Sequence, residues 1–162
     1  IDYSPENHQL MTDARAAKID GIAVPDQEVS LGDATGKLAV VGWGSTFGPI
    51  HQAVRKARAQ GLDVSHIHVR LIWPLPENLG DLLRGYDKIL VPEMNTGQFK
   101  TVLRDQYLVD AQPLTKVSGQ PFAIAEIEAA IATYFDGVAG NAGGDEVPPN
   151  PGQMPTIKSA NP

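Results

Sequence analysis

The 162-residue sequence contains no cysteine. A chain without thiols cannot form a disulfide, hold an iron–sulfur cluster or a zinc ion through sulfur, or supply a thiol nucleophile. These chemistries are therefore excluded for this chain. The absence is compatible with a reducing compartment, where disulfides are not used, and we expect a cytoplasmic location.

Long apolar runs and an excess of positive charge are also absent. No apolar run approaches the ~18 residues needed to span a bilayer, and no signal-peptide pattern is present. The net charge of −6 disfavours nucleic acid or an anionic membrane as the main partner, because both attract basic surfaces. With 42% hydrophobic and 20% charged residues, the composition is that of one soluble globular domain.

The N-terminal segment indicates a connection to something else. The chain starts with Ile1 rather than methionine, and we expect it to be a piece of a longer polypeptide. Residues 5–20 predict a helix built from good helix formers. The polar face of this helix is wide, so its packing partner is expected to lie outside the domain.

The most informative stretch runs from Lys37 to Ser45, with the sequence KLAVVGWGS. Its four consecutive apolar residues predict a strand that is buried on both faces, as in a parallel sheet covered by helices. The glycines then turn the chain towards a helix that begins near Pro49. This stretch is typical of the first strand–helix unit of an open α/β sheet.

The rest of the chain repeats the same alternation. We predict a weak strand at 28–31, clear strands at 65–72, 88–91 and 114–117, and helices that end at Gly61, begin at Leu79, cover 98–107 and end near Phe135. Four clear strands alternating with four helices predict a three-layer α/β/α fold around a parallel sheet.

The composition changes at Asp136. Residues 136–162 are rich in glycine, proline and asparagine, and such a segment cannot bury enough apolar surface by itself to offset its chain entropy. We expect an adjoining subunit to hold it through Val147, Met154 and Ile157. The alternative is that this tail wraps its own domain.

The first candidate site is the glycine-rich turn after the Lys37 strand. Backbone N–H groups at Gly42, Gly44 and Ser45 could cradle an anion at the start of the next helix, where the helix dipole favours negative charge. The spacing is neither the dinucleotide fingerprint nor a P-loop. The alternative is a tight turn that needs glycine for close packing.

The second candidate site follows the strand at 88–91. Open α/β sheets bind ligands or partners at the carboxyl ends of their strands. Glu93 could accept hydrogen bonds or protons there, while Asn95 and Gln98, on either side of Gly97, could bind the amides of a partner. The alternative is that Glu93 and Asn95 build the turn and cap the following helix.

The histidines point to no clear chemistry. His66 and His68 share one face of a strand and could chelate a metal, but no third ligand is evident, so we predict a solvated or interface face. His8 and His51 are single histidines. No nucleophile elbow, catalytic triad order or carboxylate pair is visible. The residues alone therefore indicate no catalytic residue and no metal site.

Three stretches resemble one known family when taken together and in order. They are VVGWGSTFGPIHQAV, HVRLIWPLPENL and ILVPEMNTGQFKTVLRDQY, which carry G-W-G-S, P-L-P and E-x-N-x-G-Q. Over roughly residues 3–131 the chain is similar to the 2-oxoacid:ferredoxin oxidoreductases, in the domain that resembles the C-terminal domain of transketolase. PENHQLMTDARAAKIDGIA resembles the segment that joins the preceding domain in alpha subunits of the 2-oxoglutarate type.

This resemblance implies a domain organisation and an enzyme. Residues 1–24 would be a helix and linker from a preceding domain, residues 25–135 the transketolase C-terminal-like domain and residues 136–162 the tail. The sheet would be mostly parallel with about five strands, the first antiparallel and at an edge. The implied reaction is oxidative decarboxylation of 2-oxoglutarate with coenzyme A, which gives succinyl-CoA, carbon dioxide and reduced ferredoxin.

The resemblance also implies how the cofactors are divided. Thiamine diphosphate, magnesium and a [4Fe–4S] cluster would belong mainly to the beta subunit, coenzyme A would be a co-substrate, and this chain would bind no cofactor itself. The expected partners are the beta subunit, the rest of the alpha subunit and ferredoxin, in a hetero-oligomer. No catalytic residue carries over, and Glu93, Asn95, Gly97 and Gln98 mark a motif at a predicted subunit interface.

Two alternatives stay open at this point. One is a free-standing α/β module that binds a nucleotide or an acyl group through the loop from Gly42 to Gly48. The other is the equivalent domain of a different thiamine-dependent 2-oxoacid enzyme, since fold alone does not fix function.

Overall fold

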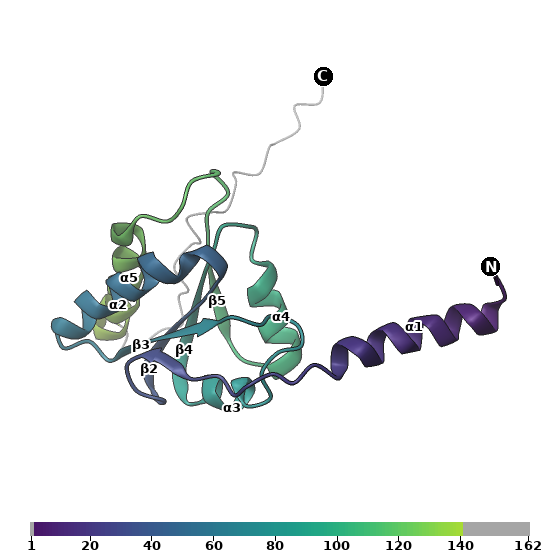
Figure 1. Cartoon of the computed structure of the whole chain (residues 1–162). Coiled ribbons are helices and arrows are strands. Elements are labelled where there is room, and N and C mark those ends of the chain that lie inside the picture. The colour runs from purple at the N-terminus through teal and green to yellow at the C-terminus, as the bar shows by residue number, and fades with distance from the viewer. Residues whose placement is uncertain (1, 141–162) are drawn as a thin grey trace, which may run out of the picture.

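The computed structural model describes residues 2–140, with side chains for residues 2–136. Figure 1 shows a sheet with helices on both faces and one N-terminal helix, α1 (Pro5–Asp20), that stands clear of the rest. The sheet contains β1 (Val29–Leu31), β2 (Gly36–Trp43), β3 (Val64–Val69), β4 (Tyr86–Glu93) and β5 (Ala111–Thr115). The other helical elements are the 3₁₀ turn η1 (Gly44–Thr46), α2 (Phe47–Ala59), α3 (Leu79–Arg84), α4 (Gln98–Tyr107) and α5 (Ile124–Gly140).

The strand order is β1-β3-β2-β4-β5. Strand β1 runs antiparallel to β3, while the pairs β2–β3, β2–β4 and β4–β5 are parallel. This arrangement confirms the predicted three-layer α/β fold with a mostly parallel sheet. It also confirms the antiparallel edge strand that the family resemblance implies.

The central strand β2 explains why the sheet has two cores. Leu38 and Val40 point to the face that α2 and α5 cover, and Ala39 and Val41 point to the face that α3 and α4 cover. All four side chains are buried. A strand that is covered on both sides reads as an uninterrupted apolar run, as the sequence of this stretch indicates.

Two predicted strands have different bounds in the structure. The strand predicted at 65–72 ends at Val69, because Val69 pairs with Trp43, the last residue of the neighbouring β2. The strand predicted at 114–117 is β5, which begins at Ala111 and contains Pro113. Proline is tolerated there because β5 is an edge strand, and its missing N–H breaks no ladder on the open side.

Three further expectations concern the chain ends. Helix α5 continues to Gly140, beyond the predicted end near Phe135, since a single glycine inside a helix costs only about 1 kcal/mol relative to alanine. The expected tail anchors Val147, Met154 and Ile157 lie outside the described residues. Helix α1 is confirmed and, as its sequence suggests, it has no buried residue.

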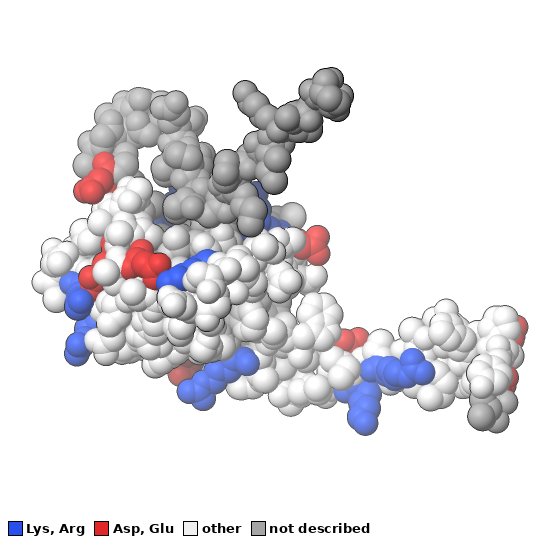
Figure 2. All heavy atoms as spheres, turned by 90° about the horizontal axis from the view of Figure 1, so that it is seen from above, with Lys and Arg blue, Asp and Glu red and all other residues white. Residues whose placement is uncertain are grey.

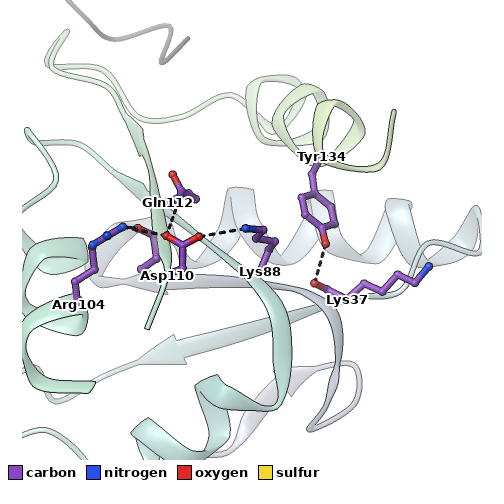
Figure 3. A network of polar contacts seen from close by, with 7 residues as sticks. Lys37, Lys88, Arg104, Asp110, Gln112 and Tyr134 are labelled. Atoms are coloured by element: carbon purple, nitrogen blue, oxygen red, sulfur yellow. Dashed lines mark hydrogen bonds and ion pairs between the residues drawn. The ribbon is translucent and has the colours of Figure 1, made fainter. Parts of the chain in front are cut away.

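A polar cluster joins three elements at the β5 edge. The carboxylate of Asp110 accepts hydrogen bonds from Lys88 on β4 and Arg104 on α4, both at 3.1 Å, and from Gln112 on β5 at 2.7 Å (Figure 3). Burial raises the pKa of Asp110, but its bond to Lys88 and the charges of Lys88 and Arg104 outweigh this and lower the pKa overall. Asp110 is exposed, so these contacts orient the edge more than they stabilise it.

The surface carries both signs of charge. In the view of Figure 2, the visible Lys and Arg side chains are dispersed among Asp and Glu, without a large patch of one sign. Within residues 2–140, no helix has the length and apolar character needed to cross a membrane.

Candidate functional site at the carboxyl edge of the sheet

Both predicted loops lie at the same edge of the sheet. Strands β2 and β4 are parallel neighbours, and β2 ends at Trp43 while β4 ends at Glu93. The first loop leads into α2 on one face, and the second leads into α4 on the other. Rings of Trp43 and Phe99 lie with their centroids 6.0 Å apart and connect the two loops.

Gly42 is held by close packing between β2 and α2. A Cβ atom at Gly42 would contact the side chain of Ile50 and would lie 2.8 Å from Oγ1 of Thr46. Both of these contacts, with Ile50 and with Thr46, would be too close for a real side chain. This contact supports the close-packing alternative for Gly42.

The rest of the glycine turn is open to solvent. Gly44 has a φ of +57°, a conformation that glycine adopts without strain, and both Gly44 and Ser45 are exposed. Oγ1 of Thr46 donates to the carbonyl of Trp43 at 2.8 Å and accepts from the Trp43 amide at 3.2 Å. The turn is thus closed by its own residues, and the role of Gly44 and Ser45 in binding an anion stays a prediction.

Glu93 is buried at the start of α4. Its Oε2 accepts a hydrogen bond from the amide of Phe99 and its Oε1 accepts one from the amide of Lys100, each at 2.8 Å. These amides belong to the first turn of a helix, where N–H groups have no partner within the helix. A negative carboxylate is also favoured there by the helix dipole.

Asn95 completes the same cap. Its Oδ1 accepts from the amides of Gly97 at 2.7 Å and Gln98 at 3.0 Å. Gly97 has a φ of +91°, which explains the glycine in the motif. The structure therefore places Glu93 and Asn95 as capping residues of α4, as the alternative prediction states, while the side chain of Gln98 lies exposed. A role of this motif at a subunit interface remains a prediction.

The structure adds a histidine cluster that the sequence pattern does not reveal. His66 is fully buried, so the predicted solvated face of β3 is wrong at this position. The reason is that α2 covers this face: the ring of His66 lies 5.2 Å from Phe47 and 5.8 Å from His51, measured between centroids. His68 follows at 5.8 Å from His66.

Phe47, the first residue of α2, contacts all three imidazoles. Its ring stacks on His51 at 5.2 Å and meets His68 edge-on at 5.0 Å. Only an indirect indication precedes the structure: the expected right-handed crossover from β2 to β3 lays the intervening helix over the sheet. His51 lies one turn after Phe47 on that helix. The alternating pattern along β3, which contains His66 and His68, therefore gives no indication of His51.

The environment of His66 and His68 disfavours their protonated forms. Burial, followed by the neighbouring charges of His68 and His51, lowers the pKa of His66 to about 3. Burial and then the charge of Arg70 lower the pKa of His68. Within the described chain, both ring nitrogens of His66 and Nδ1 of His51 and of His68 have no hydrogen-bond partner.

Metal chemistry does not fit the described side chains. Among residues 2–136, no group of three His, Asp or Glu side chains is arranged to hold a metal ion, and the sequence has no cysteine. An iron–sulfur cluster held by cysteine thiolates is excluded for this chain, because it has no cysteine.

Comparison with known proteins identifies the origin of this domain. Residues 36–147 match the family described as pyruvate:ferredoxin oxidoreductase core domain II. The chain is 51% identical over 127 residues to the 2-oxoglutarate oxidoreductase subunit KorA of Mycobacterium tuberculosis, which covers 78% of this chain and 19% of that subunit. It is 30% identical to subunit alpha of 2-oxoacid:ferredoxin oxidoreductase 2 from Aeropyrum pernix. That match covers 82% of this chain and 22% of that subunit.

Solved structures agree with these relatives. The 2-oxoglutarate:ferredoxin oxidoreductase from Magnetococcus marinus, with 2-oxoglutarate, coenzyme A and succinyl-CoA bound, superposes with a TM-score of 0.69 and 28% identity. The match covers 82% of this chain and 24% of that one. A split-gene transketolase, an inactive beta4 tetramer, shares the fold with a TM-score of 0.56 and 13% identity over 72% of this chain and 44% of its own.

Fold and comparisons together define the class: an open α/β domain with a transketolase-like fold. More closely, the chain belongs to the family of pyruvate:ferredoxin oxidoreductase core domain II. The resemblance to alpha subunits of the 2-oxoglutarate type is confirmed by KorA and by the solved oxidoreductase. The chain spans about a fifth of the length of the curated relatives it matches.

Proposed function

We propose that this chain is the C-terminal part of the alpha subunit of a 2-oxoglutarate:ferredoxin oxidoreductase. The observation that carries the proposal is the 51% identity to a 2-oxoglutarate oxidoreductase subunit over 127 residues. The reaction would be oxidative decarboxylation of 2-oxoglutarate with coenzyme A to succinyl-CoA, with ferredoxin as electron acceptor. The enzyme would be a cytoplasmic hetero-oligomer.

Within that enzyme, the domain has an architectural role. The residues of its two motifs serve the fold, since Glu93 and Asn95 cap α4 and Gly42 packs against α2. Among the described residues, no group of three His, Asp or Glu side chains is arranged to hold a metal ion. Thiamine diphosphate, magnesium and the [4Fe–4S] cluster would lie mainly on the beta subunit, and the thiamine would supply the carbanion chemistry.

The surfaces available for assembly support this role. Exposed apolar side chains follow the strand ends at Leu71, Ile72, Trp73 and Met94, and α1 exposes Leu10 and Met11. Apolar groups of this size are usually covered when they gather at one edge of a domain. The rest of the alpha subunit and the beta subunit are the partners we propose for them.

The test uses the whole alpha subunit, expressed with its partner. Gln98→Ala removes an exposed side chain of the motif, and Gln106→Ala removes an exposed glutamine at the other end of the same helix as a matched control. We expect Gln98→Ala to weaken subunit association several-fold, with unchanged turnover per assembled complex, and Gln106→Ala to change neither.

The result that overturns the architectural role is loss of turnover with intact assembly in Gln98→Ala or Glu93→Ala. The activity itself is tested by comparing kcat/KM for 2-oxoglutarate with kcat/KM for pyruvate, for which we expect a preference of at least tenfold. Recovery of this polypeptide from its source cell as a folded protein without a partner subunit would favour a free-standing module instead.

A further inference from the structure

We propose that the histidine cluster under Phe47, together with the start of α2, is a binding site for a phosphate group. The site consists of His51, His66 and His68, the N-terminal turn of α2 and the Gly42–Ser45 turn. It is separate from the proposed enzymatic activity, so either can fail without the other.

The first argument is the state of His66. Its side chain is completely buried, yet neither of its ring nitrogens has a partner in the described part of the chain. A buried polar group without a partner costs about 1–3 kcal/mol, and such groups in native proteins call for a specific reason. A neutral imidazole presents one N–H donor, so a ligand that accepts hydrogen bonds would satisfy that donor.

The second argument is that the imidazoles converge on the glycine turn. Nδ1 of His68 lies 3.5 Å from the position that a Cβ atom at Gly42 would occupy. His66 contacts Phe47, the first residue of α2, and His51 lies one turn further along the same helix. The three imidazoles therefore lie close to one another, beside the point where the chain passes from β2 into α2.

The third argument is electrostatic. Helix α2 has no acidic residue in its first turn, and no side chain in the described residues caps its N-terminus. The N-terminus of α4 has the same position after β4, but there Glu93 and Asn95 supply the oxygen atoms. A helix N-terminus after a glycine turn favours a phosphate, and Arg70 adds a positive charge next to His68.

These features select an anion over a metal ion. The ring contacts of the three histidines are with Phe47 and with one another, and among the described residues no group of three His, Asp or Glu side chains is arranged to hold a metal ion. Phosphate, with its double negative charge and several acceptor oxygens, matches a site with several donors and a positive helix end.

Access to the site depends on Phe47. Its side chain is 42% exposed and its ring lies 5.0–5.2 Å from each of the three imidazoles. Gly44 and Gly48 flank it, and neither has a heavy atom within 4 Å of an added Cβ among the residues described. Rotation of this one ring towards solvent would expose the imidazoles, so Phe47 acts as the cover of the site.

The experiment uses the full 162-residue chain at pH 7.5, with inorganic phosphate and AMP as probes in calorimetric titrations. We expect one phosphate to bind and to raise the Tm. His66→Leu should weaken binding at least tenfold and should also raise the Tm of the ligand-free chain, because it replaces unpartnered nitrogens by apolar atoms. His8→Gln, which changes the exposed histidine of α1, should do neither.

A second measurement keeps the test valid if His66→Leu does not fold. In histidine-labelled wild-type chain, phosphate should shift the imidazole NMR signals of His51, His66 and His68 and leave that of His8 unchanged. AMP binding at least tenfold tighter than phosphate identifies the phosphate as part of a nucleotide-like ligand, and equal affinities identify free phosphate; both results support the site.

Three results would overturn the proposal. One is the absence of binding by both probes at tens of millimolar. Another is equal phosphate affinity in wild type and His66→Leu. The third is binding of zinc, tested alone as a probe, with no response to phosphate, because this would make the cluster a metal site.

Discussion

The backbone amide of Phe99 donates a hydrogen bond of 2.8 Å to Oε2 of Glu93, six residues earlier in the chain. The other oxygen of the same carboxylate binds the Lys100 amide. A charged side chain at the end of β4 is thereby used to begin α4. Its contacts are all with its own domain among the described residues, which is why the E-x-N-x-G-Q motif marks the fold before it marks any chemistry.

Replacing this carboxylate by an amide should destabilise the domain. In Glu93→Gln, one oxygen becomes an NH₂ group that faces a backbone N–H, so two donors meet without an acceptor. We expect the free energy of unfolding to fall by about 1–3 kcal/mol, measured by urea denaturation. Glu77→Gln, an exposed position, is the control and should change it little; a Glu93→Gln value equal to this control would contradict the capping role.

Asn95 should contribute less than Glu93, because it is partly exposed and binds two amides with one oxygen. Asn95→Ala should cost about 1 kcal/mol, the usual value for losing a capping side chain. Asn95→Asp keeps the accepting oxygen and should retain most of the stability. Thermal unfolding of the three proteins checks this order, and an aspartate variant as unstable as the alanine variant would speak against it.

Gly42 at the end of β2 and Gly48 at the start of α2 should respond in opposite ways to alanine. Gly42→Ala places a methyl group against Ile50 and Thr46, and such overpacking typically costs 1–3 kcal/mol. Gly48→Ala meets no atom within 4 Å in the described chain and lies in α2, where alanine is favoured over glycine by up to about 1 kcal/mol. Urea denaturation of both variants measures the contrast; destabilisation by both would show that the whole turn is packed.

Acid should unfold the domain partly through His66. Its pKa is about 3 in the folded chain and 6.5 when unperturbed, so the unfolded chain binds a proton that the folded chain does not. Folded stability therefore falls as the pH drops below 6.5, by about 1.4 kcal/mol per pH unit from this group alone, until the pH nears 3. Above pH 6.5 the group has no effect.

The comparison of wild type with His66→Leu isolates this term, since carboxylates contribute equally to both proteins. As the pH is lowered from 7.5 to 4.5, the urea concentration at the denaturation midpoint should fall less steeply in the variant than in wild type. Identical pH dependence of the two proteins would mean that His66 is not buried in the neutral form.

The fold can be predicted from the sequence because β2 and β4 are covered by helices on both faces. Strands of this kind leave uninterrupted apolar runs, and α2 and α4 show the helical spacing that covers them. The predicted last strand begins at residue 114, three residues after the start of β5 at Ala111, and β5 tolerates Pro113 only because it lies at an edge of the sheet. A local pattern cannot indicate which strand is at the edge.

At the candidate site, the capping residues can be predicted from the sequence, but the histidine cluster cannot. Glu93 and Asn95 act on amides within seven residues, so their capping role follows from local order. The cluster of His51 with His66 depends on a helix packing on a strand that comes after it. Period-two alternation then suggests a polar face at His66, although helix packing has made it an interior one.

The state of helix α1 should indicate whether this domain is in contact with the rest of the enzyme. With 16 residues and a rise of about 1.5 Å per residue, it extends roughly 24 Å, and it has no buried residue to stabilise it. Helices of this length are marginal in water without packing. Hydrogen exchange along α1 should consequently be fast in the separate chain and slow in the complete enzyme, so a single peptide would record when this domain meets its neighbours.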